Sequence, residues 1–357
     1  MLLIYELLRH IAAYAVVVGA VVTVHEFGHF VVARACGVRV LRFAIGFGSP
    51  LISYKDPTTG TVWQIGWIPL GGYVMLFGDA SASERESLKL TAEEQKHAYA
   101  YQSVARRMAI VLAGPLINYI LAFVIAFGMI YSNGVLVIPP VVAQVVEDSP
   151  AQGKLLPHDR VLSVNGTEVY SFTELAMNID LYKTMGLVLV VERQHQPLVL
   201  NIPPLKKQEK LGIVADVTDE HVQELGIADS ATYALWRLYT IHIASWEGLK
   251  QILLGDRSMD DLQGTVATAK VAAQGMQNGA VSMLNVIAMI SLGLGFTNLL
   301  PIPLLDGGRL MFLVFEAIFR RPLPHRIEMM ANWMGLAIIV SVLVCVNIND
   351  IKKLPLG

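Results

Sequence analysis

Four long apolar stretches constrain this sequence more than any other feature. A helix that crosses a bilayer needs about 20 mostly apolar residues. The stretches that meet or approach this length are residues 7–33, 108–131, 283–305 and 327–346. Only 16% of the residues are charged, whereas soluble domains contain about a quarter. The sequence therefore predicts an α-helical polytopic membrane protein with about four transmembrane helices.

The first apolar stretch also has features of a secretory signal peptide, because residues 11–24 are apolar and residues 33–35 read Ala-Arg-Ala. However, three ionisable residues, His25, Glu26 and His29, precede that cleavage-like sequence. We therefore interpret the stretch as a membrane span. The net charge of −2 gives no basic surface for nucleic acid, so we expect the bilayer and membrane proteins as partners and no nucleic acid.

Basic residues indicate the orientation of the spans, since loops rich in Lys and Arg stay in the cytoplasm. They cluster around the connection between spans one and two and around the connection between spans three and four: Arg34, Arg39, Arg42, Arg106, Arg107, Arg309, Arg320, Arg321 and Arg326. Lys352 and Lys353 argue mildly for the opposite orientation. We expect a multi-pass protein of the bacterial inner membrane, with residues 132–282 on the periplasmic side.

The first span contains the motif HExxH, as His25-Glu26-Phe27-Gly28-His29. Residues i and i+4 of a helix share a face, so both imidazoles can reach one metal ion. Zinc suits this set, since it lowers the pKa of bound water to about 7. Glu26 would take the proton during attack and return it to the leaving amine.

A five-residue motif also occurs by chance on solvated helices, but this one lies within an apolar span, where ionisable groups are costly. A shared metal ion offsets that cost. The third ligand is expected from Asp306, which follows an apolar run broken by prolines and precedes two glycines. Irregular backbone at membrane depth is tolerated where it lines a cavity. Without the HExxH motif, Asp306 would read as an ordinary helix-terminal residue at the interface.

Between the first two spans, residues 42–48 and 62–68 read as short strands separated by a turn at residues 56–60. Together, residues 38–78 predict a glycine-interrupted hairpin that lies at the membrane face or dips into the protein interior. The alternative is an ordinary surface hairpin. Residues 79–106 are polar and charged and read as a solvated connector.

Residues 137–217 predict a small β-rich domain outside the membrane. Asn165-Gly166 is a hairpin turn signal, and residues 172–182 read as a helix. Ser149-Pro150-Ala151, Gly153 and Asp159 resemble a PDZ domain, which binds extended peptides by strand addition. Residues 218–282 form the linker to the C-terminal membrane part at 283–357. Its amphipathic segment 229–254 lies either on the bilayer surface or against the PDZ-like domain.

Several motifs together resemble the site-2 protease family, and the match is closest to its bacterial branch of sigma-E regulators. The motifs are HExxH in the first span, Gly46-Phe47-Gly48, Gly71-Gly72-Tyr73-Val74, Ala113-Gly114-Pro115 with Asn118, the PDZ-like insertion and Leu305-Asp306-Gly307. The resemblance covers nearly the whole chain in order. One departure is that enterobacterial relatives carry two PDZ domains, whereas this chain has room for one.

The resemblance implies specific roles for the matching residues. His25, His29 and Asp306 would hold Zn²⁺, with Glu26 as the catalytic carboxylate. The substrate-binding residues would be Asn298, Pro301 and Pro303 before the aspartate and, on a membrane-reentrant β-sheet in residues 1–136, Gly46, Phe47, Gly48, Gly71, Gly72 and Tyr73.

Three functions fit the sequence to different degrees. An intramembrane zinc endopeptidase, acting on anti-sigma factors or remnant signal peptides in a stress response, uses every motif. A membrane scaffold that binds partners through the PDZ-like groove needs none of His25, His29 and Asp306. A metal transporter would show repeated halves with interrupted helices, and these are not apparent. The sequence therefore favours the protease.

Overall fold

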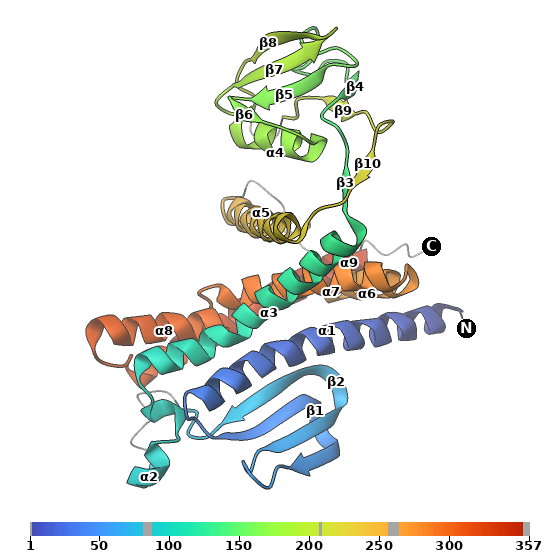
Figure 1. The fold of residues 1–357 in the computed structure, drawn as a ribbon. Coiled ribbons are helices and arrows are strands. Elements are labelled where there is room, and N and C mark those ends of the chain that lie inside the picture. Colours follow the sequence, from blue (N-terminus) through green and yellow to red (C-terminus); the bar gives the residue numbers. More distant parts are fainter. Residues whose placement is uncertain (1, 81–87, 207–208, 256–263, 353–357) are drawn as a thin grey trace. The chain divides into compact units, whose positions relative to one another are not determined.

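The computed structural model describes residues 2–80, 88–206, 209–255 and 264–352. The chain divides into two compact units. The helical unit comprises Met1–Gly128 and Ala231–Gly357, and the inserted unit comprises Met129–Ser230. Figure 1 labels the helices and strands of both units.

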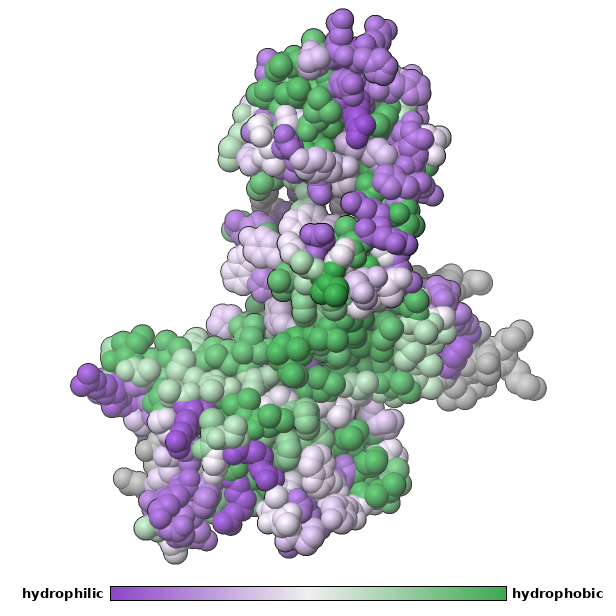
Figure 2. All heavy atoms as spheres, in the orientation of Figure 1, coloured by the Kyte–Doolittle hydropathy of each residue, from purple (hydrophilic) through white to green (hydrophobic). Residues whose placement is uncertain are grey.

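Four of the described helices are long and apolar enough to cross a membrane. They are α1 (Leu2–Ala35), α3 (Val104–Asn133), α7 (Ala280–Leu299) and α9 (His325–Lys352). Figure 2 shows hydrophobic residues gathered in a continuous band over this helical part. The prediction of a polytopic membrane protein with four candidate spans is therefore confirmed.

The predicted third span, 283–305, is wrong at its C-terminal end. Helix α7 ends at Leu299, and a separate helix, α8 (Asp306–Phe319), starts at the aspartate. Pro301 and Pro303 lack the amide hydrogens that a continuing helix would need, and Leu304 adopts a left-handed φ of 79°. Asp306 is thus the first residue of a new helix and not the last residue of a span.

The predicted hairpin consists of two strands longer than expected, β1 (Val40–Lys55) and β2 (Val62–Leu76). Both strands bend sharply, and Gly46 and Gly48 at the bend of β1 have φ of 79° and 86°. The bends produce four rows in the order 72–76, 40–45, 62–66 and 50–55, in which the two outer pairs run antiparallel and the residue numbers of the central pair rise together. Residues 72–76 therefore form an outer row of this small sheet.

This sheet packs on helix α1. Phe43 and Trp63 of the sheet contact the ring of Phe30 on α1, with ring centroids 5.6 and 5.1 Å away. Further along, a Cβ on Gly19 of α1 would lie 3.3 Å from the carbonyl oxygen of Pro69 in β2. The close approach fixes strand β2 along the helix that carries the HExxH motif.

The connector predicted as solvated over residues 79–106 is partly wrong. Helix α2 (Ala92–Gln95) is on the surface, but the 3₁₀ helix η2 (Tyr99–Tyr101) contributes buried Tyr99 and Ala100. Tyr99 packs in a core cluster with Ala33, Val38 and Ile110. Its apolar ring explains the burial, which the charged neighbours concealed in the sequence. Residues 81–87 of this prediction lie outside the described residues.

Helix α5 (Ile227–Leu253) confirms the helix predicted over 229–254. Its Leu238 and Ile241 pack against a cluster formed by Ala122 of α3 with Ala288 and Leu292 of α7. Exposed apolar side chains on α5 include Leu235 and Trp246. A contact with the bilayer surface stays a prediction.

Helix α6 (Thr265–Gln277) was not predicted within the linker. Its Ala272 and Ala273 are buried against Ala13 and Val17 of α1. Small side chains let the two helices approach closely, as is common between membrane helices. Residues 256–263 of the predicted linker lie outside the described residues.

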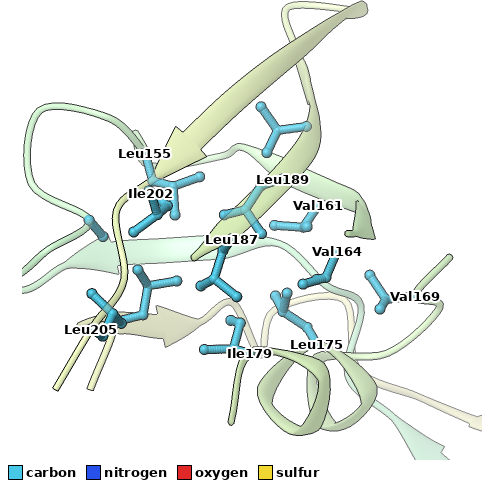
Figure 3. Packing of buried hydrophobic residues seen from close by; sticks show 13 residues of the cluster. Leu155, Val161, Val164, Val169, Leu175, Ile179, Leu187, Leu189, Ile202 and Leu205 are labelled. Atoms are coloured by element: carbon cyan, nitrogen blue, oxygen red, sulfur yellow. The ribbon is translucent and has the colours of Figure 1, made fainter. Parts of the chain in front are cut away.

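The inserted unit has its own core. Strands β5 (Arg160–Val164), β6 (Thr167–Glu168), β7 (Leu187–Arg193) and β8 (Gln196–Ile202) form an antiparallel sheet in the order β6-β5-β7-β8. Helix α4 (Phe172–Tyr182), predicted at the same residues, buries Leu175 and Ile179 in this core. Figure 3 shows the two side chains facing Leu187 and Val164 of the sheet.

Two further strand pairs complete the inserted unit. Strand β4 (Val142–Val145) pairs antiparallel with β9 (Ile213–Ala215), and β3 (Val135–Val137) pairs antiparallel with β10 (His221–Gln223). The chain therefore enters and leaves this unit along adjacent strands. The assignment of the unit as PDZ-like remains a prediction.

Candidate metal centre

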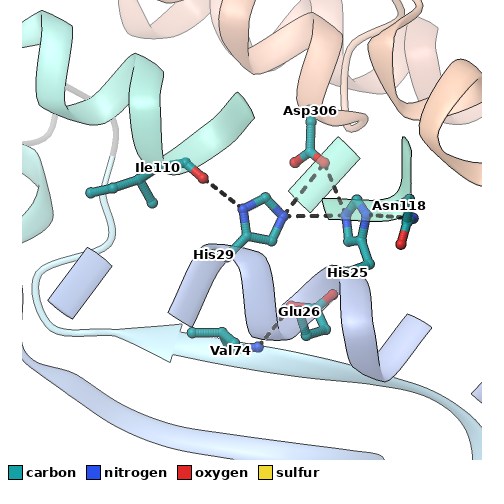
Figure 4. Close-up of polar contacts among 7 residues, drawn as sticks. All are labelled: His25, Glu26, His29, Val74, Ile110, Asn118 and Asp306. Atoms are coloured by element: carbon teal, nitrogen blue, oxygen red, sulfur yellow. Dashed lines mark hydrogen bonds and ion pairs between the residues drawn. The ribbon is translucent and has the colours of Figure 1, made fainter. Parts of the chain in front are cut away.

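Two imidazoles and one carboxylate converge in the helical unit. His25 and His29 lie one turn apart on α1, and their Nε2 atoms are 3.2 Å from each other. Oδ2 of Asp306, at the start of α8, lies 3.0 Å from Nε2 of His25 and 3.5 Å from Nε2 of His29. Figure 4 shows the three side chains pointing toward one another from the two helices.

Helix α3 supplies a polar partner for the second nitrogen of each imidazole. Nδ1 of His29 lies 2.8 Å from the carbonyl oxygen of Ile110. Because a carbonyl only accepts, Nδ1 must carry the proton, which leaves the lone pair on Nε2. Nδ1 of His25 lies 3.2 Å from Nδ2 of the fully buried Asn118, whose Oδ1 has no hydrogen-bond partner among the described residues; turning this amide by 180° brings Oδ1 to Nδ1 as an acceptor. Both rings are thus held with Nε2 toward Asp306.

Glycines create the space in which the rings meet. A Cβ on Gly114 of α3 would lie 2.2 Å from Nε2 of His29 and 2.8 Å from Cε1 of His25. On α1, a Cβ on Gly28 would lie 2.4 Å from the carbonyl oxygen of Ala113. Helices α1 and α3 therefore approach each other closely at the motif, and a side chain at position 114 would occupy the volume of the imidazoles.

The donor set fits a tetrahedral zinc ion. Zinc–ligand bonds of about 2.0–2.1 Å give a tetrahedron with edges of about 3.3 Å. The three donor–donor distances of 3.0, 3.2 and 3.5 Å bracket that length. Oδ2 of Asp306 is buried and, despite its short distances to the imidazoles, has no hydrogen-bond partner of acceptable geometry. A buried carboxylate oxygen without a hydrogen-bond donor, beside two imidazole nitrogens, is suited to a cation.

Glu26 lies on the turn between the two histidines but is held by the β-sheet. Its Oε2 accepts a hydrogen bond of 3.1 Å from the backbone N–H of Val74, in the outer row of the sheet. Gly72 in the same row allows β2 to approach β1 closely, since a Cβ there would lie 2.6 Å from the carbonyl oxygen of Ala44 and at an ordinary contact distance of 3.7 Å from Cγ of Glu26. The strand therefore positions the carboxylate beside the three converging donors.

A cavity of about 290 Å³ opens onto the centre. Its wall includes the converging residues, the outer row of the sheet and polar groups from other elements: His25, Glu26, His29, Tyr73, Val74, Asp79, Tyr99, Asn298, Asp306 and Arg309. Burial raises the pKa of the Tyr99 hydroxyl to about 12, so this group stays protonated at neutral pH. The cavity therefore places carboxylates, hydrogen-bond donors and the Arg309 guanidinium around His25, His29 and Asp306.

The residues predicted to bind substrate are distributed unevenly around this cavity. Tyr73 and Asn298 line it. Phe47 stacks on Tyr73 with ring centroids 6.1 Å apart, and a Cβ on Gly71 would lie 3.0 Å from the Phe47 ring. Of the predicted substrate-binding residues, those other than Tyr73 and Asn298 are not in the cavity wall. Gly46 and Gly48 bend strand β1, Gly72 lies against Glu26, and Pro301 and Pro303 end helix α7.

Sequence reasoning missed several groups that shape the centre. The carbonyl of Ile110 leaves no trace in a sequence, because any residue provides one. Gly114 was noted only as part of a motif, and Tyr99 was hidden in a charged connector. A buried ion pair was also missed: Arg107 of α3 donates two hydrogen bonds, of 3.1 and 2.6 Å, to Glu316 of α8. This pair ties the helix that carries Asp306 to the helix that supports the histidines.

The chain is similar to known metalloproteases over most of its length. Residues 13–342 match the family model of peptidase family M50. A provisionally named zinc metalloprotease of Rickettsia conorii is 34% identical over 360 residues, covering 96% of this chain and 99% of the relative. One of Mesorhizobium japonicum is 35% identical, covering 94% and 96%. Metalloprotease MmpA of Caulobacter vibrioides is 31% identical, covering 94% of each chain.

Proposed function

Because the chain belongs to peptidase family M50 and is a zinc metalloprotease with four candidate membrane spans, we propose that it cleaves peptide bonds within the membrane. Its substrates are the transmembrane segments of single-span proteins, such as anti-sigma factors or remnant signal peptides. The observation that carries this proposal is the convergence of His25, His29 and Asp306 at 3.0–3.5 Å in a span-sized apolar helix bundle.

In this proposal, Nε2 of His25, Nε2 of His29 and a carboxylate oxygen of Asp306 hold the zinc ion. When bound, zinc acts as a Lewis acid that makes water nucleophilic at neutral pH and polarises a carbonyl. Burial excludes competing ligands from the donor set, since the His25 side chain is only 7% exposed and that of Asp306 15%. The Ile110 carbonyl keeps His29 in the tautomer with a free Nε2, and Oδ1 of Asn118 does the same for His25 once the amide is turned toward Nδ1.

Glu26 moves the proton. Its Oε2 is held by the Val74 amide, which leaves Oε1 as the atom that accepts a proton from the attacking water. The same oxygen later returns the proton to the nitrogen of the leaving amine. Holding the carboxylate by a backbone N–H fixes its position without neutralising it, because the amide donates a hydrogen bond and carries no net charge.

Substrate binds as an added strand on the outer row at residues 72–76. A transmembrane helix hides its carbonyls in its own hydrogen bonds, and freed backbone groups are costly in lipid. Pairing with a sheet edge satisfies those groups while it exposes the scissile bond. Tyr73 and Val74 lie in that row and in the cavity wall. Asn298, which lines the same cavity, is positioned to donate a hydrogen bond to the substrate carbonyl.

The clusters of Arg at residues 34–42, 106–107 and 320–326 favour an inner-membrane protein with the metal centre toward the cytoplasm. The inserted unit is then periplasmic. Its antiparallel sheet with helix α4 supports a PDZ-like domain that binds an extended peptide end. Such a domain admits substrates only after another protease has trimmed them.

The test uses purified protein in lipid nanodiscs with a single-span model substrate. Glu26→Gln should retain one zinc per chain and lose cleavage, whereas Asp306→Asn should lose both zinc and cleavage. Glu93→Gln is the matched control, because Glu93 is exposed and pairs with the likewise exposed Lys96 on the surface helix α2. Wild-type cleavage rates in Glu26→Gln, or wild-type zinc content in Asp306→Asn, would refute the assigned roles.

A further inference from the structure

Helix α9 is attached to the rest of the helical unit at few points. Of its described residues, only Gly335, Val346 and Asp350 are buried. Gly335 and Val346 are eleven residues apart, which is close to three helical turns, so the three buried positions share one face. The remaining faces carry exposed apolar side chains such as Trp333 and Met334. The last span thus touches its neighbours through one narrow stripe.

The far end of this stripe packs on helix α6. Oδ2 of Asp350 accepts a hydrogen bond of 2.9 Å from the backbone N–H of Ala267, in the first turn of α6. Gly264, the N-cap of α6, has no side chain to make such a bond. Asp350 therefore caps a neighbouring helix, and this contact anchors α9 away from the metal centre.

The near end of the stripe packs on the segment that delivers Asp306. A Cβ on Gly335 would lie 2.3 Å from the carbonyl oxygen of Pro303 and 2.9 Å from its Cβ. A carbon atom in favourable contact with a carbonyl oxygen keeps a distance of about 3.3 Å. The backbone of α9 therefore presses directly on Pro303, and no residue larger than glycine fits without movement.

The same segment is enclosed from its other side by the start of α8. A Cβ on Gly307 would lie 2.2 Å from the carbonyl oxygen of Leu300, and one on Gly308 would lie 2.3 Å from that of Ile302. Residues 300–305 thus lie between α8 and α9. Leu304 holds a left-handed φ of 79°, which is costly for a side chain of this size and persists only where the surroundings enforce it.

We propose that Gly335 is a positioning residue for the metal centre: through Pro303, it lets α9 seat residues 300–305 so that the Asp306 carboxylate meets the two imidazoles. This inference rests on the proposed role of Asp306 as a zinc ligand. Pro303 precedes Asp306 by three residues, and a methyl group at position 335 requires a displacement of about 1 Å at Pro303, judged from the favourable contact distance. Metal sites tolerate about 0.2 Å in ligand distance.

The prediction is that Gly335→Ala binds zinc at least tenfold more weakly than wild type, measured in nanodiscs by competition with a chelator. Cobalt substitution provides a second readout, because the visible absorption of Co²⁺ reports the ligand geometry directly. The altered spectrum should appear in protein that remains folded by circular dichroism. Gly293→Ala is the matched control, since a Cβ on this α7 glycine meets nothing within 4 Å.

A reciprocal measurement needs no variant. If α9 positions Asp306, zinc binding must in turn hold α9 and residues 300–305, because coupling between two sites is mutual. Adding zinc to the wild-type apoprotein should therefore slow hydrogen exchange around Gly335 and residues 300–305. Exchange near Asp350, at the other anchor, should change little.

The outcomes separate this inference from the proposed function. Wild-type zinc affinity and cobalt spectrum in Gly335→Ala, with Asp306→Asn impaired, would overturn the role of Gly335 alone. Wild-type affinity in both variants would overturn the ligand role of Asp306. If Gly335→Ala does not fold, the exchange experiment decides, and equal protection with and without zinc around Gly335 rejects the inference.

Discussion

Replacing Asn118 by leucine tests whether the hydrogen bond to Nδ1 of His25 contributes to zinc affinity. Leucine has the same number of side-chain heavy atoms and the same branching as asparagine, so the change removes the polar contact to Nδ1 of His25, which spans 3.2 Å, and keeps the branched shape of the side chain. Asn118 is fully buried, so water cannot take its place. Nδ1 of His25 would then be a buried donor without a partner whenever Nε2 faces the metal.

The expected cost follows from this burial. Loss of an outer-shell partner typically weakens metal binding by about 10- to 100-fold, which corresponds to about 1.4–2.8 kcal/mol. A buried donor without a partner costs about 1–3 kcal/mol, so the two magnitudes agree. Asn118→Asp should bind zinc more tightly than Asn118→Leu, because the aspartate still offers an oxygen to the imidazole N–H.

The assay is zinc affinity in nanodiscs at a series of buffered free zinc concentrations. Asn133→Leu, at the C-terminal end of α3, is the control and should bind zinc like wild type. If the leucine and aspartate variants at position 118 show equal affinity, the hydrogen bond has no role. If both equal wild type, His25 is oriented by other contacts and the reasoning from Nδ1 is refuted.

Three further changes have defined outcomes. Gly114→Ala should abolish measurable zinc binding, because its Cβ would lie 2.2 Å from Nε2 of His29. Gly128→Ala should leave zinc affinity unchanged, because a Cβ added there would meet no described atom within 4 Å. Glu316→Ala should lower the free energy of unfolding by about 3–5 kcal/mol, since it leaves Arg107 buried without its carboxylate; thermal unfolding that matches wild type would contradict this. Zinc at 100 times its Kd should stabilise the wild-type protein by about 2.7 kcal/mol and Asp306→Asn by much less, and equal shifts in Tm would contradict the ligand assignment.

The membrane helices could be predicted because their signal is long and uniform. Helix α4 was equally predictable, since its apolar residues recur at helical spacing between clear turn signals. Helices α6 and α8 were missed for different reasons. Helix α6 consists largely of small residues that gain their burial from α1, and Gly307 and Gly308 at the start of α8 resemble a loop in sequence although they sit in a helix.

The convergence of His25, His29 and Asp306 could be predicted because metal-binding chemistry depends on side-chain identity and spacing. The residues that support these three side chains could not be predicted, because their role depends on which helices pack together in the fold. Ile110 contributes only a carbonyl, Gly114 contributes only the absence of a side chain, and Gly335 acts from a span about thirty residues beyond Asp306. Such contributions become visible only when α1, α3 and α9 are seen in place.

The pairing of β3 with β10 has a consequence for how this architecture can diversify. Val135–Val137 and His221–Gln223 pair antiparallel and follow α3 and precede α5 closely in the chain, so the inserted unit begins and ends on neighbouring strands. A module inserted between two adjacent strands can be exchanged, duplicated or trimmed while the helices on either side keep their connections. The inserted unit can therefore change in sequence at a different pace from the helices that carry His25, His29 and Asp306.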